Sequence, residues 1–292
     1  MSGQPLRYEP PPEHDQHLRG MIRFLIICFA ALTIIVAIVV LNAQTLARYL
    51  PFSAEVRFAD GIESSFSSFV DDTRREEQIL VERYLQSLAN NLSTSMALPD
   101  DYEITVHFVR SAEANAFATI GGHVFVFSGL IDMLPDENSL AMVLAHEIAH
   151  IAHRDPLASI GRGLALQIVY SFLTGRQSGS TDIATLGGNV GLMFFSREQE
   201  QRADLAAIEA LQTSYGHVAG NETLFRLLAD QSAEDAEPTL PAWLLTHPQL
   251  EERIDSLRTL ADERGWTTGI PRHIPAEVTT ALRSMQPETT TP

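Results

Sequence analysis

Two histidines and a glutamate in His146-Glu147-Ile148-Ala149-His150 have the spacing of a catalytic metal motif. Residues four apart lie on one face of an α-helix, so His146 and His150 can direct two imidazole nitrogens at one ion. Zinc is the expected ion, because two histidines, one carboxylate and a position left open for water form a known catalytic set. Glu147 would act on that water as a general base and then protonate the leaving amine. The motif predicts zinc-dependent hydrolysis of peptide bonds.

The third zinc ligand must come from outside this motif. A histidine six residues after His150 is excluded, since Pro156 stands there. His153 lies one turn past His150, near the expected end of the helix, and is interpreted as a capping or supporting residue. A downstream carboxylate is the better candidate, and Glu200 is favoured over its rival Glu198.

Glu200 and Asp204 are four residues apart on a second predicted helix, and therefore share one of its faces. Glu200 could bind zinc, while Asp204 could accept a hydrogen bond from a ligand imidazole and so determine its tautomer. Glu198 points elsewhere on that helix, where a solvated role suits it better.

The two motifs together resemble a known family of zinc metallopeptidases of the gluzincin type, which includes HtpX, the CAAX prenyl protease and the β-barrel assembly-enhancing protease. The family pattern is HExxH followed by S-R-x-x-E-x-x-A-D, and here the second part reads Ser196-Arg197-Glu198-Gln199-Glu200-Gln201-Arg202-Ala203-Asp204. The resemblance implies that Glu200 is the third ligand and that Asp204 supports the site. It covers roughly residues 70–260 and extends to these segments: Asn115–Ala118, Gly121-Gly122, Ser128–Leu130, and Thr246-His247-Pro248 with Arg253.

The chain differs from HtpX and the prenyl protease in membrane content, because those have several spans and this chain has one clear apolar segment. Processing of prenylated substrates is therefore not expected. By resemblance, the substrates are proteins or peptides near the membrane, in particular misfolded or misassembled envelope proteins. The alternative is a non-catalytic chaperone or adaptor that keeps the fold, although such a protein would not need the base Glu147.

Two later residues are further candidates for the chemistry. His247 precedes Pro248 in a constrained turn, where it could stabilise the oxyanion or occupy the open zinc position at rest. An ordinary histidine whose partners are backbone groups is the alternative. Arg253 is expected to pair with a carboxylate of the site helices or to help hold the oxyanion.

A substrate-binding strand is expected at Gly122, His123 and Val124, where the predicted strand His123–Phe127 begins. If this strand lies at a sheet edge above the metal, an extended substrate would bind by adding a strand to it. The alternative is an ordinary buried strand.

The elements that position these residues predict an α+β fold: a mostly helical, zincin-like peptidase domain with a small β-sheet over residues 69–265. The motif helix should run from the cap Asp136 to Asp155 and end at Pro156. The remaining expected elements are an amphipathic helix over Asp71–Ser93, strands over Glu103–Val109 and His123–Phe127, and helices from Ser196 past Leu211 and over 157–174, 222–234 and 249–263. Residues 266–292 are expected to be a flexible tail.

One transmembrane helix is expected at residues 21–41, because Phe24–Leu41 is 18 residues without a charge. The run is longer than a signal-peptide core and lacks a good cleavage site, which favours a retained single anchor. A disordered tail (1–20) should precede it and a linker (42–68) should follow it. The apolar region 157–195 is interpreted as a hairpin packed on the domain or dipping into the bilayer surface, or as a lid.

The charge distribution and the cysteine content indicate where the domain lies, which partners it has and which residues can bind a metal. Three arginines precede the span and two follow it, which favours a periplasmic domain on a bacterial inner membrane; the reversed, cytoplasmic topology is the alternative. The net charge of −17 argues against nucleic acid as a partner. The single cysteine, Cys28, excludes an intrachain disulfide and a cysteine-based zinc site, so histidines and carboxylates must supply the ligands.

Overall fold

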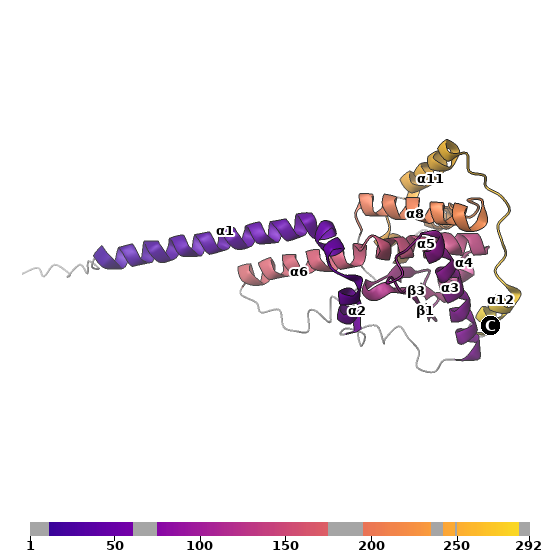
Figure 1. Cartoon of the computed structure of the whole chain (residues 1–292), viewed down its shortest axis with the longest axis horizontal. Helices are drawn as coiled ribbons and strands as arrows, with labels where there is room; N and C mark the ends of the chain where they lie inside the picture. Colours follow the sequence, from indigo (N-terminus) through magenta and orange to yellow (C-terminus); the bar gives the residue numbers. More distant parts are fainter. Residues whose placement is uncertain (1–11, 61–74, 175–194, 235–241, 249, 286–292) are drawn as a thin grey trace, which may run out of the picture.

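The computed structural model describes residues 12–60, 75–174, 195–234, 242–248 and 250–285. In Figure 1 a long helix, α1 (Pro12–Tyr49), projects from a body of helices packed around a small sheet. The predicted α+β class is confirmed: the described residues are mostly helical, with one three-stranded sheet and one apolar N-terminal helix.

Helix α1 extends beyond the expected span at both ends. Within it, His17–Tyr49 is long and apolar enough to cross a membrane, and none of its most apolar stretch is buried. Residues 12–20 continue this helix, so the expected disordered tail is wrong for them, and residues 1–11 lie outside the described part. The expected linker is also helical up to residue 60, because α1 ends only at Tyr49 and α2 (Phe52–Asp60) follows.

Helix α6 (Asp155–Thr174) packs along α1, as Figure 1 shows. The small side chains of Ala43, Ala47 and Ala158 form the buried contact between the two helices. The apolar region expected at 157–195 is thus a single helix as far as Thr174, and its remainder, 175–194, lies outside the described residues.

The sheet consists of β1 (Thr105–Val109), β2 (Ala116–Ala118) and β3 (His123–Phe127) in the order β1-β3-β2. β3 pairs in parallel with β1 and antiparallel with β2, so it is the central strand. The expectation of a sheet edge at Gly122, His123 and Val124 is therefore wrong, and the alternative of an internal strand holds. The edge strand β2 was not predicted, because three residues are too few to show an alternating pattern.

Gly122 has a structural reason to be glycine. It closes the short turn η3 (Ile120–Gly122) with a φ of +87°, which side chains rarely adopt. A Cβ at this position would lie 2.1 Å from the carbonyl oxygen of Glu103. The backbone approach that allows β1 and β3 to pair therefore depends on this residue.

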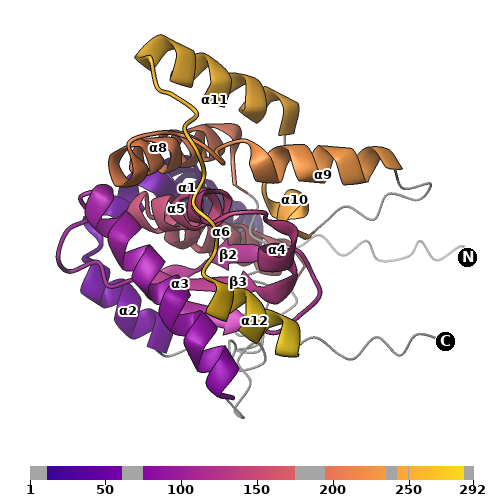
Figure 2. The same ribbon diagram turned by 90° about the vertical axis from the view of Figure 1, so that its right-hand side faces the viewer.

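Helix α5 (Glu137–Ala152) is the centre of the body, between the sheet and α8 (Arg197–Tyr215), as Figure 2 shows. Every residue from Glu137 to Ile151 is buried, which is typical of a helix that is apolar around its circumference. Helix α3 (Glu76–Ser95) packs against α5 and β1, and α4 (Ser128–Met133) follows β3. The polar side chains of α5 therefore lie in a protein interior.

The two ends of α5 differ in how well local sequence predicted them. Asp136 caps the start as expected, accepting a hydrogen bond of 2.8 Å from the backbone N–H of Ser139. The end lies at Ala152 rather than Asp155, and Pro156 stands in the first turn of α6 instead of terminating α5. A proline is tolerated there because the N–H groups of a first helical turn have no partner within the helix.

The C-terminal part comprises α9 (Thr223–Glu234), α10 (Ala242–Thr246), α11 (Leu250–Arg264) and α12 (Ala276–Met285). Helix α12 packs on α3 and buries Val278, Ala281, Leu282 and Met285 in the main core. The expected flexible tail is therefore wrong for residues 266–285, where an amphipathic pattern of ten residues stands among threonines and prolines. Residues 286–292 lie outside the described part.

Candidate active site

His146 and His150 face each other on successive turns of α5. Their Nε2 atoms are 3.0 Å apart, and the ring planes are inclined at 86°. Both side chains are buried, although an imidazole in an apolar interior needs polar partners. The four-residue spacing therefore brings two imidazole nitrogens to one point, as two ligands of one metal ion require.

Glu200 reaches the same point from the first turn of α8. Ser196 caps this helix and forms a reciprocal capping box with Gln199, which determines where the first turn begins. The Glu200 carboxylate lies 3.4 Å from the Nε2 of His146 and 3.6 Å from the Nε2 of His150. Glu198 is exposed, so the structure separates the two candidates left open by the sequence.

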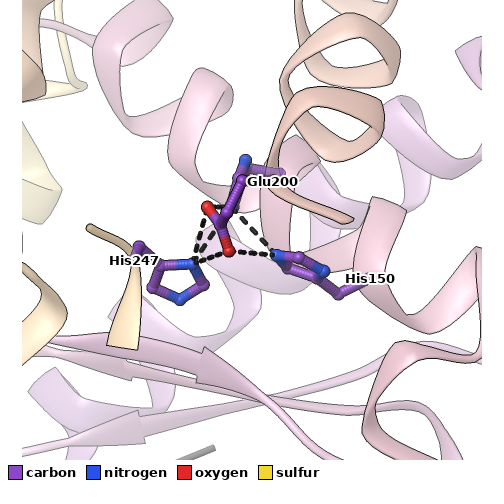
Figure 3. A group of neighbouring side chains, drawn as sticks. His150, Glu200 and His247 are labelled. Carbon is purple, nitrogen blue, oxygen red and sulfur yellow. Dashed lines mark hydrogen bonds and ion pairs between the residues drawn. The ribbon is translucent and has the colours of Figure 1, made fainter. Parts of the chain in front are cut away.

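His247 comes to the cluster from the segment that follows α10. Figure 3 shows it with Glu200 and His150, and its Nδ1 lies 3.0 Å from a carboxylate oxygen of Glu200. Its ring stacks on Trp243 at a centroid distance of 4.6 Å. The backbone-satisfied histidine that was the alternative is thus not what the structure has.

The four side chains form a donor set that fits a divalent metal. One donor atom from each of His146, His150, Glu200 and His247 lies within 4.8 Å of the others, and all four side chains are buried. Among the residues that the structure describes, the Nε2 of His247 has no hydrogen-bond partner. Imidazole nitrogens and a carboxylate, converging away from water, are the ligands that zinc prefers in catalytic sites.

Glu147 points away from the shared face of the two histidines and is held by two donors. One oxygen accepts a hydrogen bond of 2.9 Å from the backbone N–H of Ala118 on β2. The other accepts one of 3.2 Å from the indole N–H of Trp243 and lies 3.5 Å from the Nε2 of His247. The sheet edge and α10 therefore hold this carboxylate beside the donor set.

A profile of Peptidase family M48 matches residues 80–261, which is more than half of the chain. The chain belongs to peptidase family M48. The resemblance inferred from the two motifs is thereby confirmed, and the matched region contains every candidate ligand.

Curated relatives agree with this membership of family M48. The β-barrel assembly-enhancing protease of Yersinia pestis is 31% identical over 203 residues, which are 63% of this chain and 40% of that protein. The Escherichia coli (strain K12) protein of the same name is 31% identical over 200 residues, or 63% and 39% of the two chains. The mitochondrial metalloendopeptidase OMA1 of Danio rerio is 27% identical over 254 residues, or 76% and 47%. The chain spans less than half the length of each of these relatives.

In this M48 member, Asp204 and Arg253 form a buried pair beside the ligands. The guanidinium donates two hydrogen bonds to Asp204, of 2.8 Å and 2.6 Å, and lies 2.8 Å from Glu200. Asp204 in turn lies 3.0 Å from the Nδ1 of His146, a position from which it could orient this ring. Burial opposes ionisation of Asp204, but Arg253 and His146 together outweigh it, through their charge and hydrogen bonds, and lower the pKa of Asp204 to about 2.

Asp155 also contacts a candidate ligand, although neither sequence motif predicted it. Its carboxylate lies 2.8 Å from the Nδ1 of His150, the nitrogen that faces away from the donor set. Burial opposes protonation of His150, but hydrogen bonds to Asp155 and Glu200 outweigh it and raise the pKa of His150 to about 10. Asp155 begins α6, beyond the end of α5, so no spacing along a single helix pointed to it. His153, which did follow the spacing, is absent from the donor set.

The expected substrate-binding residues do not join this cluster. His123 on β3 lies 3.0 Å from the ring of His107 on β1, and Val124 is buried in the core. Their strand is separated from Glu147 by β2, which lies at the edge of the sheet and supplies a hydrogen bond to the Glu147 carboxylate. His123 and Val124 thus belong to the central strand β3, and Gly122 to the turn that precedes it.

Proposed function

We propose that this chain is a membrane-anchored, zinc-dependent endopeptidase that cleaves proteins at or near the membrane. The observation that carries the proposal is the buried donor set of His146, His150 and Glu200 beside the carboxylate of Glu147. His146, His150 and Glu200 would hold the ion. When bound, zinc supplies a Lewis acid that polarises a peptide carbonyl and lowers the pKa of water.

Glu147 carries the proton in this proposal. Its two hydrogen bonds, from Ala118 and Trp243, keep the carboxylate in one orientation without occupying all of its lone pairs. It would take a proton from the attacking water and give it to the amine that leaves. Arg253 would act through Asp204 and Glu200, by keeping both carboxylates ionised and in position, rather than by direct contact with the oxyanion.

The edge strand β2 is the better candidate for binding an extended substrate. The N–H of Ala118 points away from β3 and toward Glu147, so this edge faces the proposed base. Because alternate residues of a strand present their backbone groups to the same side, Ala116 would share that edge. A peptide added there would lie beside the donor set.

The location follows from α1 and from the relatives. An apolar helix of sufficient length supports a single-pass anchor, and exposed Leu166, Ile168 and Tyr170 on the neighbouring α6 support close contact of the body with lipid. Bacterial relatives named β-barrel assembly-enhancing protease support a role in envelope protein quality control. The excess of arginines before the span supports a periplasmic domain on a bacterial inner membrane. Protein substrates and membrane lipid are then the partners, and the net charge of −17 disfavours nucleic acid.

The test is Glu147→Gln in the full-length protein purified in detergent. We expect casein degradation to fall by about 10²- to 10⁴-fold, the usual contribution of general acid–base catalysis, while the zinc content stays at the wild-type level. Glu198→Gln is the matched control, because it removes an exposed carboxylate near the site and should leave the rate unchanged.

Chelation should abolish the activity, and added zinc should restore it. Equal degradation of casein by the wild type and by Glu147→Gln would overturn the peptidase proposal. Retained suppression of aggregation by both proteins would then favour the chaperone or adaptor.

A further inference from the structure

Gln44 connects the anchor helix to the body next to the candidate ligands. It lies on α1 just past the expected span 21–41, and its amide N–H₂ donates to the carboxylate of Asp155 at 2.7 Å and to the backbone carbonyl of His153 at 2.5 Å. Its carbonyl oxygen accepts a hydrogen bond of 3.1 Å from the side chain of Gln199. Both the N–H₂ group and the carbonyl oxygen of the Gln44 side chain are therefore hydrogen-bonded to the body.

The Asp155 carboxylate links Gln44 to His150. One oxygen lies 2.8 Å from the Nδ1 of His150. The other accepts from Gln44 and, at 2.9 Å, from Gln199, with the guanidinium of Arg202 at 3.5 Å. Asp155 is fully buried, so its orientation depends on these donors.

Gln199 extends the same network to the other ligand-bearing helix. Its side-chain oxygen accepts from the backbone N–H of Ser196 at 2.9 Å, as part of the capping box, and it immediately precedes Glu200. Gln44 thus contacts the residue that orients His150 and the residue that shapes the first turn beneath Glu200. A single amide on α1 therefore contacts a neighbour of His150 and a neighbour of Glu200.

Other buried polar contacts hold the same end of α1 in place. The guanidinium of Arg154 donates to the carbonyl of Leu50 at 2.9 Å and pairs with Glu55 of α2 at 2.9 Å. Glu55 also accepts a hydrogen bond of 3.0 Å from the backbone N–H of Gly121. Both charged side chains are buried, so these contacts hold the end of α1 and α2 against the body.

We infer that Gln44 is a positioning residue of the metal site, which acts through Asp155 to orient the ring of His150. The anchor helix is then a structural part of the site as well as its attachment to the membrane. This inference rests on the proposed zinc-dependent function, since orientation of His150 matters only if the ring binds a metal.

The experiment measures zinc affinity in the full-length protein in detergent, by competition with a chromophoric chelator. Gln44→Met keeps the length of the side chain but removes its donor and acceptor. Partners that orient a ligand typically change metal affinity by about 10- to 100-fold, so we expect Asp155→Asn to fall in this range and Gln44→Met to lose about 10-fold, at its lower limit. Asn42→Leu is the matched control, because Asn42 is an exposed amide on the same helix, bonded only to its own helix at Ile38 among the contacts that are described.

A double variant separates a positioning role from a general structural one. If Gln44 acts through Asp155, Gln44→Met combined with Asp155→Asn should bind zinc no more weakly than Asp155→Asn alone. Independent effects on packing would instead multiply the two losses. If Gln44→Met does not fold, Gln44→Asn provides the same test, because its shortened side chain cannot reach Asp155.

The outcomes distinguish this inference from the proposed function. A wild-type protein that binds no zinc contradicts the proposed function itself. If the wild type binds zinc and the Gln44 variants bind it as tightly as Asn42→Leu, or if the double variant is additive, the positioning role is wrong and the proposed function stands.

Discussion

The two ends of α5 both bury charged and polar side chains, but they differ in how these groups are arranged. At the first turn, the Glu137 carboxylate accepts hydrogen bonds from the hydroxyls of Tyr84 and Tyr215, at 3.0 Å and 3.2 Å, and from Arg272 at 3.2 Å. One acceptor group thus has three donors. This end connects α3, α8 and the segment before α12, and the Glu137 carboxylate is matched by donors within the protein.

At the last turns of the same helix, possible metal ligands converge on one point. The two Nε2 atoms of His146 and His150 lie 3.0 Å apart, with Glu200 beside both. One ligand atom from each of these three residues and from His247 lies within 4.8 Å of the others, in a buried position that a cation would fit. The comparison shows that burial of charge by itself does not identify a functional site, whereas the convergence of several metal-binding atoms does.

The largest effect is expected when the carboxylate of Glu200 is removed from the cluster of possible metal ligands. Glu200→Gln removes the charged ligand, so we expect zinc affinity to fall by more than the roughly 100-fold upper limit for partners that only orient a ligand, with loss of peptidase activity. Metal-free stability should fall as well, since Glu200 also pairs with the buried guanidinium of Arg253 at 2.8 Å. Chelator competition and thermal unfolding measure the two quantities, with Glu198→Gln as the control. Wild-type zinc affinity in Glu200→Gln would place the metal elsewhere.

A smaller effect is expected when the fourth member of the cluster is removed. His247 lies among the donors, which favours a resting state in which it occupies the position that substrate and water must use. A competent state that is a minor conformer is typically about 0.1–10% populated, so His247→Ala should raise the peptidase rate by about tenfold. The rate with casein is the measurement. A lower rate would favour stabilisation of the oxyanion, and an unchanged rate would remove His247 from the mechanism.

The smallest effect concerns the start of α5 around Glu137, where we expect the stability of the protein to depend on pH. Burial, together with the neighbouring Glu137 carboxylate, raises the pKa of Tyr84 and of Tyr215. The unfolded chain releases these protons above about pH 10, whereas the folded protein retains them. Their contribution to the free energy of unfolding is therefore complete below about pH 10 and is lost as the pH rises through the raised values.

Urea unfolding at about pH 9 and about pH 11, on either side of the ordinary tyrosine pKa, measures this loss. All 20 basic side chains are arginines, which stay protonated in this range, so the tyrosines dominate the change. Tyr84→Phe should reduce the pH dependence and itself cost about 1 kcal/mol or less. Glu147→Gln, at the other end of α5, should leave the pH dependence as in the wild type. If the free energy of unfolding of Tyr84→Phe falls as steeply with pH as that of the wild type, the tyrosines are not the cause of the loss.

The sequence by itself determined the local geometry of this protein. The spacing of His146 and His150, the cap at Asp136 and the capping box that begins at Ser196 all involve residues within one or two helical turns, where the backbone repeat relates sequence to space. The apolar helix and the mostly helical α+β class follow from composition and periodicity in the same way. Features of this kind need no knowledge of how distant segments meet.

Only the tertiary structure decided which distant groups meet at the histidines. Periodicity placed Glu200 and Asp204 on one face of a helix, but it did not say that Glu198 would be left in solvent. Asp155 lies beyond a helix end, β2 is too short to have a pattern, and Gln44 is a polar residue next to an apolar span. Their roles arise from the packing of α1, α6 and α8 around α5, which is set by the burial of apolar surface over the whole chain and not by any local repeat.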